Sequence, residues 1–145
     1  MKVSTKGRYA LRMLLDLAEN KEEGFVSLKS IAERQNISKQ YLEQIVTLLN
    51  TSTILRANRG RQGGYMLAKE PSQYTVGQIL RITEGSLAPI ACLEDEVNLC
   101  ERVEACKTLP MWHGLNKVIS NYLDSVTLQD MLEQHQEQGA DSYTI

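Results

Sequence analysis

The chain lacks long apolar runs and any leader that resembles a secretion signal. No stretch approaches the roughly 18 consecutive apolar residues that a membrane span needs. The first residues, MKVSTKGRYALRMLLDLAEN, start with basic character but contain no cleavage site of small residues. We therefore expect a cytoplasmic protein that does not enter a membrane and whose thiols stay reduced and available to metals.

The chain also has few histidines and none of the common catalytic motifs. Its 2 histidines, His113 and His135, lie in the C-terminal half, and no G-x-S-x-G, H-E-x-x-H or phosphate-loop pattern occurs. Cys106 and His113 are the one nucleophile and base pair to consider, but a loop with several thiols is a poor site for nucleophilic catalysis. We expect a binding protein and not an enzyme.

The modest net charge conceals a strong asymmetry. Residues 1–69 carry 12 Lys and Arg against 6 Asp and Glu, which gives +6, whereas residues 70–145 carry 4 against 12, which gives −8; together they make the net −2. A basic half favours a polyanion through phosphate neutralisation and counterion release, and an acidic half must face elsewhere. Random surface charge is the plain alternative.

Apolar periodicity predicts three helices in the basic half, over residues 5–20, 28–35 and 39–50, with Ser27 and Ser38 as N-caps of the last two. The short turn at Asn36 makes the last two a helix-turn-helix, a motif that reads DNA with its second helix. A plain helical hairpin would show the same pattern. The polar side chains that we expect to face DNA at this second helix are Ser38, Lys39, Gln40, Tyr41, Glu43 and Gln44.

A basic glycine turn follows between two short β-prone runs, residues 53–57 and 65–68. Strand, turn and strand form a hairpin wing. Its turn holds Arg59 and Arg61, which we expect at a DNA backbone or minor groove, with Lys6 as a further phosphate contact. The expected fold is therefore mostly α with a small β-hairpin wing: a winged helix-turn-helix domain plus a C-terminal dimerisation helix.

The remaining half divides into a helix, a loop and a further helical segment. Thr75 and Gln78 form a capping box for a helix that ends near Gly85. We predict a DNA-binding domain over residues 1–85, a sensor loop over 86–109, a dimerisation helix and short C-terminal helix over 110–135, and a flexible tail over 136–145. Packing of the 110–124 stripe on the first helix is the alternative to dimerisation. The predicted dimer interface consists of Trp112, Leu115, Ile119, Tyr122 and Leu123.

All 3 cysteines, Cys92, Cys100 and Cys106, fall in the predicted loop with the spacing C-x7-C-x5-C. Thiolates select zinc or iron–sulfur clusters over calcium or magnesium. Structural zinc usually has close C-x2-4-C pairs, which are absent here, and clusters take four ligands. His113 or a loop acid such as Glu94 is a candidate fourth ligand, without any being singled out. A reversible disulfide between two thiols, a zinc site and a purely structural role are the alternatives.

Several segments together resemble the IscR/NsrR/CymR family of bacterial winged-helix repressors: STKGRYALRMLLDLA, SLKSIAERQNISKQYLEQIV, RGRQGGYMLAKEPSQYTVGQILRITEG and LDSVTLQDML. The resemblance covers residues 1 to about 133. It implies homodimers that bind partly palindromic operators. In IscR types it implies a [2Fe–2S] cluster, in NsrR types a nitric-oxide-sensitive cluster, and in CymR types a role in cysteine metabolism without the cluster cysteines.

By this resemblance, Cys92, Cys100 and Cys106 match the cluster ligands, with [2Fe–2S] favoured over [4Fe–4S]. Gln40 and Glu43 match base-contacting positions, and Arg59 the groove-contacting one. Two positions depart from the pattern: Leu109 stands where IscR types have a histidine ligand, and Arg8 where NsrR types have an acidic one. The segment GSLAPIACLEDE and the C-terminal Tyr143-Thr144-Ile145 resemble CymR types, which keeps a cysteine-metabolism role and a regulatory protein partner as alternatives.

Overall fold

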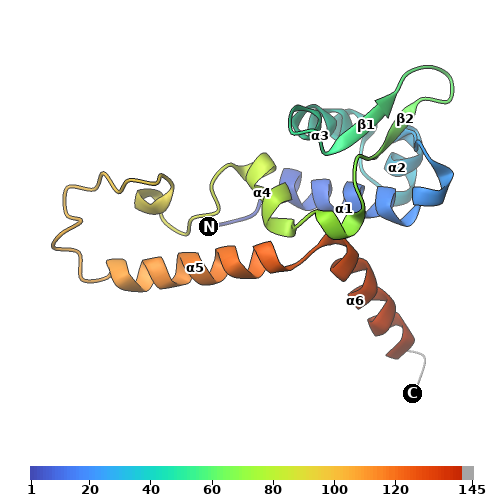
Figure 1. The fold of residues 1–145 in the computed structure, drawn as a ribbon. Coiled ribbons are helices and arrows are strands. Elements are labelled where there is room, and N and C mark those ends of the chain that lie inside the picture. Colours follow the sequence, from blue (N-terminus) through green and yellow to red (C-terminus); the bar gives the residue numbers. More distant parts are fainter. Residues whose placement is uncertain (142–145) are drawn as a thin grey trace.

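The computed structural model describes residues 1–141, the last two by their backbone only. Within that range the chain is mostly helical with one two-stranded antiparallel sheet, which confirms the predicted fold class (Figure 1). The α-helices and strands are α1 Thr5–Glu19, α2 Leu28–Gln35, α3 Lys39–Thr51, β1 Leu55–Asn58, β2 Gly64–Leu67, α4 Val76–Glu84, α5 Leu109–Ser125 and α6 Leu128–Asp141. Short 3-10 turns are η1 Lys21–Glu23, η2 Pro71–Gln73 and η3 Ala91–Leu93.

Four helices begin where a hydroxyl side chain satisfies an otherwise free backbone N–H. Each hydroxyl accepts a hydrogen bond from the N–H three residues ahead, which stabilises the first turn. The capping residues are Ser4 for α1, Ser27 for α2, Ser38 for α3 and Thr75 for α4. Local hydroxyl chemistry therefore places the two helices of the helix-turn-helix within a residue of their predicted starts.

One apolar core joins α1, α2, α3 and the wing. Fully buried side chains from each of the three helices meet there, including Met13, Ile31 and Ile45. Tyr74, which precedes α4, lies in the same core, and its hydroxyl donates to the carbonyl of Ile54 at 3.2 Å. Leu128 of α6 is fully buried there as well, so the far end of the chain is anchored in the N-terminal domain.

A buried carboxylate holds α1 against the helix-turn-helix. Asp16 is only 2% exposed, yet its two oxygens accept from Arg34 Nη2 at 2.7 Å and Nε at 3.0 Å. Gln35 Nε2 donates to the same carboxylate at 3.0 Å and Asn20 Nδ2 at 3.4 Å. The hydrogen bond that Arg34 donates to Asp16 is the leading cause that raises the pKa of Arg34, so the guanidinium stays charged. The carboxylate thus has several donors, as a buried charge requires.

The wing is attached to the domain by a third extended segment that the sequence pattern does not reveal. β1 and β2 pair antiparallel with Leu55 opposite Leu67 and Asn58 opposite Gly64. Val26 pairs with Tyr65 through two backbone hydrogen bonds of 2.9 and 2.8 Å. A Cβ at Gly64 would lie 2.3 Å from the Val26 carbonyl oxygen, so only glycine permits this approach.

Backbone hydrogen bonds and an ion pair connect α4 and the residues just before it to the C-terminal helices. Val76 N–H donates to Val126 O at 2.8 Å, and Leu128 N–H donates to Tyr74 O at 3.0 Å. Arg81 of α4 forms a bidentate ion pair with Asp124 of α5, with distances of 2.6 and 2.9 Å. The hydrogen bonds from Arg81 lower the pKa of Asp124 and keep this carboxyl charged.

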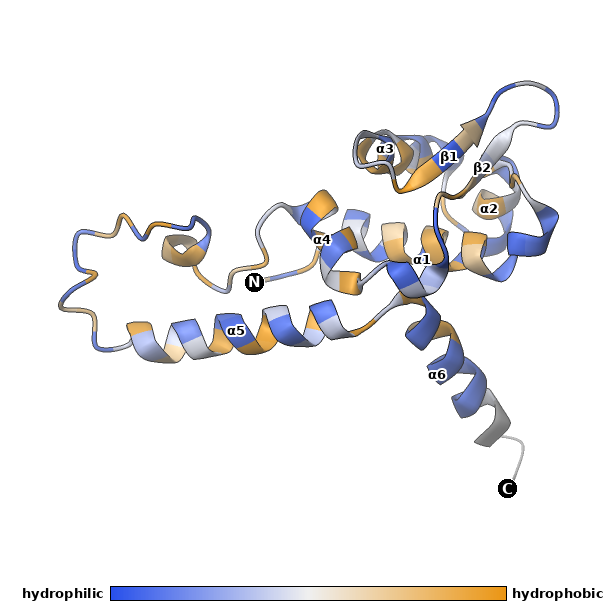
Figure 2. Cartoon of the chain, viewed as in Figure 1, coloured by the Kyte–Doolittle hydropathy of each residue, from blue (hydrophilic) through white to orange (hydrophobic). Residues whose placement is uncertain are grey.

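Helix α5 forms an arm beside the domain, and none of its described residues is buried (Figure 1). Apolar residues recur along it, as the hydropathy colours of the ribbon show (Figure 2). Val118 and Tyr122 are each 65% exposed, and Met111 and Leu115 are also exposed. An apolar stripe with this exposure is covered in most proteins by a partner surface.

The structure differs from the predicted boundaries in two places. α6 continues to Asp141, so the flexible tail predicted from residue 136 is wrong for residues 136–141, and residues 142–145 lie outside the described residues. The loop between α4 and α5 includes the turn η3. In the described residues no helix is long and apolar enough to cross a membrane.

The Asp16 site predicts a measurable loss of stability. Asp16→Asn keeps the size of the side chain but removes the charge that Arg34 requires. Breaking a buried pair costs about 3–5 kcal/mol, and because the Arg34 side chain is 38% exposed we expect a smaller loss of about 1–3 kcal/mol in the free energy of unfolding. Urea denaturation measures it. Glu33→Gln on the exposed side of α2 is the matched control, and an equal loss in both variants would contradict the assignment.

Candidate DNA interface and cysteine loop

Helix α3 buries one side and exposes the side predicted to read DNA. Leu42, Ile45, Val46 and Leu49 are buried in the domain core. The predicted side chains Lys39, Gln40, Glu43 and Gln44 are exposed, as is Ser38 at the cap. α3 therefore offers one cation, two amides and one carboxylate together at its exposed start, which are the groups that hydrogen-bond to base edges and phosphates.

Tyr41 differs from its neighbours because it is half-buried. Its ring meets the ring of Tyr9 of α1 edge to face, with centroids 5.6 Å apart and an interplanar angle of 78°. The Arg12 guanidinium lies 5.0 Å from the centroid of the Tyr9 ring. Tyr41 thus fixes the start of α3 on α1, and Tyr9 and Arg12 are supporting residues that the sequence pattern alone did not mark.

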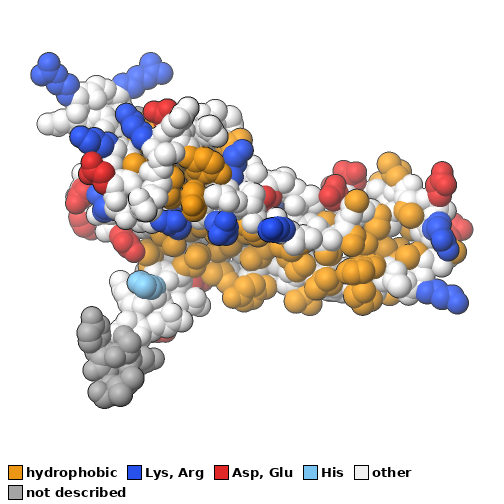
Figure 3. Space-filling model, turned by 180° about the vertical axis from the view of Figure 1, so that it is seen from behind, with side chains coloured by type: hydrophobic (Ala, Val, Ile, Leu, Met, Phe, Trp, Pro, Cys, Tyr) orange, Lys and Arg blue, Asp and Glu red, His pale blue; other side chains and the backbone are white. Residues whose placement is uncertain are grey.

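The wing turn places two arginines at the far end of the hairpin from the core. Arg59 and Arg61 are exposed, and Gly60 between them has a φ of 116°, a conformation that favours glycine. Within the described residues neither arginine side chain has a hydrogen-bond or ion-pair partner. Seen from behind, Lys and Arg side chains project from the end of the molecule that holds the wing (Figure 3). Lys6 lies on α1, half-buried.

The three cysteines lie along the loop between α4 and α5, and all three thiols are free. Cys100 and Cys106 line the same open cavity of about 490 Å³, together with Arg102 and Lys107. Cys92 lies on η3 and does not line that cavity. The structure therefore brings two of the predicted ligands to one cavity and leaves the third apart.

Cys106 lies just before the first turn of α5. The Thr108 hydroxyl, 3.4 Å from Cys106 Sγ, is the main cause that lowers the pKa of this thiol. Backbone N–H groups of Thr108 and Leu109 and the charge of Arg102 act in the same direction, against the effect of burial. The thiolate is the form of cysteine that binds metals.

The thiols of Cys92, Cys100 and Cys106 are ligands of the type that a thiolate-bound metal centre needs, although the loop does not bring all three together. In residues 1–141 no group of three or more His, Cys, Asp or Glu is arranged to hold a metal ion. Asn98 accepts from Cys100 N–H at 2.9 Å through Oδ1, while its Nδ2 is shut off from solvent without a hydrogen-bond partner. Buried donors normally have acceptors, and a thiolate or sulfide supplies one. The three thiols and this amide are therefore of the chemical kind that an iron–sulfur centre uses, although the described residues do not bring them together.

The fourth ligand stays unassigned. His113 is exposed on α5, and the loop acids Glu94, Asp95, Glu96, Glu101 and Glu104 are exposed. Leu109 begins α5 and supplies no donor. Arg8 donates to the Thr5 hydroxyl at 3.1 Å on α1. No contact favours one of these residues over the others.

The predicted dimer residues do not all share one surface. Leu123 packs against the small apolar cluster of Val76, Leu80 and Leu87 and so contributes inside the chain. Tyr122 and Leu115 are exposed on the arm, and Trp112 and Ile119 are half-buried. A hydrophobic surface extends along the arm in the view from behind (Figure 3).

Comparison with known proteins decides the family. Residues 3–134 match the Rrf2 family, described as "Iron-dependent Transcriptional regulator". The chain belongs to the Rrf2 family. The protein is therefore a DNA-binding transcriptional regulator and not an enzyme.

Rrf2 relatives of two kinds resemble this chain. The HTH-type transcriptional regulator CymR of Bacillus subtilis is 42% identical over 131 residues, which is 90% of this chain and 89% of CymR. The structure of CymR, titled the global cysteine regulator of B. subtilis, matches with a TM-score of 0.76 at 40% identity, covering 92% of this chain and 98% of that one. T. potens IscR matches with a TM-score of 0.73 at 42% identity, covering 95% and 90%.

The interface predicts separable roles for Arg61 and Glu43. Arg61→Gln removes a phosphate contact, so we expect weaker binding to all duplexes and a fall of about 1 in the slope of log K against log salt. Glu43→Ala removes an acceptor for cytosine N4, so we expect preference for a selected operator over random duplex to fall by about 1–3 kcal/mol with little change in slope. Fluorescence anisotropy over a salt series measures both. A loss of affinity confined to one sequence in Arg61→Gln would contradict the phosphate assignment.

Proposed function

We propose that this Rrf2 protein is a repressor whose operator binding responds to an iron–sulfur cluster held by Cys92, Cys100 and Cys106, with [2Fe–2S] favoured over [4Fe–4S]. The observation that carries the proposal is the position of the three thiols. They occupy the segment that joins α4 of the DNA-binding domain to the arm α5. The genes it controls are then those of iron–sulfur cluster supply, and a cytoplasmic location, where thiols stay reduced, is part of the proposal.

The loop can influence DNA binding because it joins α4, which packs on the domain, to the start of α5, whose other end is tied back to α4. α4 packs against α1, and Arg81 ties α4 to Asp124 of α5. Closure of residues 92–106 around three ligands would shorten the loop and move the start of α5 relative to α4. A ligand shifts an equilibrium between two arrangements by its differential affinity for them. The bound cluster would supply thiolate coordination that is sensitive to oxidants and to iron supply.

A homodimer converts that movement into a change of operator affinity. The exposed stripe Met111, Leu115, Val118 and Tyr122 supports a seam between two α5 helices. Two recognition helices related by twofold symmetry match two half-sites of a partly palindromic operator, and their spacing depends on the seam. A shift of α5 against α4 in each copy would change that spacing.

A cluster-free regulator of cysteine metabolism is the second candidate. The likeness to CymR favours it. The common cavity of Cys100 and Cys106 supports a thiol switch in this case, because two cysteines on one cavity can form a disulfide when an oxidant such as peroxide converts one of them to a sulfenic acid. A cysteine-synthesis enzyme is the protein partner that this candidate implies.

Anaerobic purification distinguishes the two candidates. We expect visible absorption and iron and sulfide in the wild-type protein, and at least about tenfold less iron in Cys106→Ser, because a missing ligand exposes the cluster. Leu109→His supplies a histidine three residues after Cys106, so we expect its colour to survive longer in air. Ala91→Ser, in the same loop, is the control. Colourless wild-type protein without iron would favour the cysteine-metabolism candidate.

The seam is tested at the two most exposed positions of the stripe. We expect a sedimenting mass near 32.8 kDa for the wild type, which is twice the 16.4 kDa chain, and 16.4 kDa for Val118→Glu combined with Tyr122→Glu. Lys117 lies on another side of α5 than the stripe, so the Lys117→Glu variant should keep the mass of a dimer. A dimer that persists in the double variant would refute the seam. We avoid Leu123 because it packs inside the chain.

A further inference from the structure

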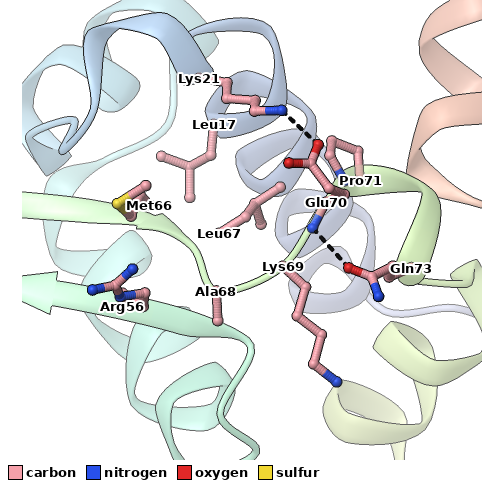
Figure 4. Close-up of a pocket in the computed structure, with 10 residues that line it drawn as sticks. All are labelled: Leu17, Lys21, Arg56, Met66, Leu67, Ala68, Lys69, Glu70, Pro71 and Gln73. Atoms are coloured by element: carbon pink, nitrogen blue, oxygen red, sulfur yellow. Dashed lines mark hydrogen bonds and ion pairs between the residues drawn. The ribbon is translucent and has the colours of Figure 1, made fainter.

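A cavity at the root of the wing is separate from both the DNA interface and the cysteine loop. It has a volume of about 310 Å³ and lies between the end of α1, the strands at the end away from the wing turn, and η2 (Figure 4). Small-molecule sites in proteins begin at about this size. Since one water occupies about 30 Å³ of liquid, the cavity accepts a ligand of about ten non-hydrogen atoms.

The lining combines an apolar floor with two cations, Arg56 and Lys69, that have no ion-pair partner in the described residues, and the Lys69 side chain points away from the floor (Figure 4). Leu17 and Pro71 are buried, and Met66 and Leu67 are half-buried. Lys21 Nζ lies 2.5 Å from Glu70 Oε2, so these two charges neutralise each other at one end of the cavity (Figure 4). Arg56 lies across the strand pair from Met66, and within the described residues its guanidinium has no hydrogen-bond or ion-pair partner.

The lining residues favour a ligand of a particular charge and a particular shape. A guanidinium offers a planar pair of donors that matches a carboxylate. The apolar floor beside it favours a short hydrocarbon body, which a free inorganic anion lacks. The Lys21–Glu70 pair closes the opposite end without adding net charge. A small carboxylate with an aliphatic tail therefore satisfies both parts of the cavity.

We infer that this cavity is an effector site for a small aliphatic carboxylate, with Arg56 binding the carboxylate and the Leu17, Met66 and Leu67 side chains binding its tail. Such a ligand bridges α1, both strands and η2. It restrains the hairpin against α1 and thereby the direction in which the wing turn extends. Its effect on operator affinity rests on the proposed DNA-binding function, whereas binding of the carboxylate does not.

Calorimetry on the full chain tests the site with hexanoate as the probe. We expect hexanoate to bind, and hexan-1-ol and hexylamine not to bind. Arg56→Gln should lower the affinity for hexanoate at least about tenfold, because it removes the charged donors that bind the carboxylate. Met66→Trp should fill the cavity and abolish hexanoate binding. Lys29→Gln removes an exposed cation outside the cavity and should leave hexanoate affinity unchanged. Amide NMR shifts should change at residues 66–70.

Several results would overturn the inference. Absence of hexanoate binding, tighter binding of hexyl phosphate than of hexanoate, or equal affinity in wild type and Arg56→Gln removes the carboxylate site. Circular dichroism checks that Met66→Trp folds. If Met66→Trp does not fold, the hexanoate affinity of Arg56→Gln decides whether the carboxylate site exists. Operator affinity should change at least about threefold with saturating hexanoate in the wild type and not in Arg56→Gln. Hexanoate binding without that change overturns the effector role, whereas a chain that binds hexanoate but no DNA contradicts the proposed function alone.

Discussion

The buried carboxylate of Asp16 is the constraint on which the orientation of the helix-turn-helix, α2 and α3, depends. Its oxygens accept from Arg34 and Gln35 at the end of α2, so the angle between α1 and α2 is set by directional hydrogen bonds as well as by apolar packing. The turn after α2 leads at once into α3, whose start is held on α1 by the Tyr9–Tyr41 contact. Two polar or aromatic contacts from one helix therefore orient the surface that meets DNA, and the apolar core beneath supplies the free energy that keeps them together.

Much of this architecture follows from local chemistry. Hydroxyl caps at Ser27, Ser38 and Thr75 and the 3.6-residue periodicity give helix starts that agree with the structure, because capping and amphipathicity act over a few residues. Contacts between distant segments have no such signature. The pairing of Val26 with Tyr65, the Arg81–Asp124 ion pair and the inward packing of Leu123 each join segments separated by more than 35 residues. The end of α6 was placed too early because residues 136–141 carry few apolar side chains to signal a helix.

The candidate site divides in the same way. Outward side chains of α3 and the wing arginines were predictable, because burying one face of a helix exposes the other. The loop thiols were predictable in sequence but not in arrangement, since Cys100 and Cys106 share a cavity that excludes Cys92. Asn98 gave no signal in the sequence, and only its unpaired amide in the folded loop marks it. The family assignment agrees with both candidate functions, so the chemistry of the loop separates them.

If a second copy covers the arm α5, the regulator becomes sensitive to its own abundance. None of the residues of α5 is fully buried, and its contacts with the rest of the chain include Leu123 on the small apolar cluster and the Arg81–Asp124 ion pair, both near its C-terminal end. A surface that covers the stripe therefore adds to its helical order. If a second copy does so, folding of the arm and assembly become one equilibrium that depends on protein concentration. A cell could then set the threshold of repression through the rate at which it makes and degrades this protein, without any change in the signal at the loop.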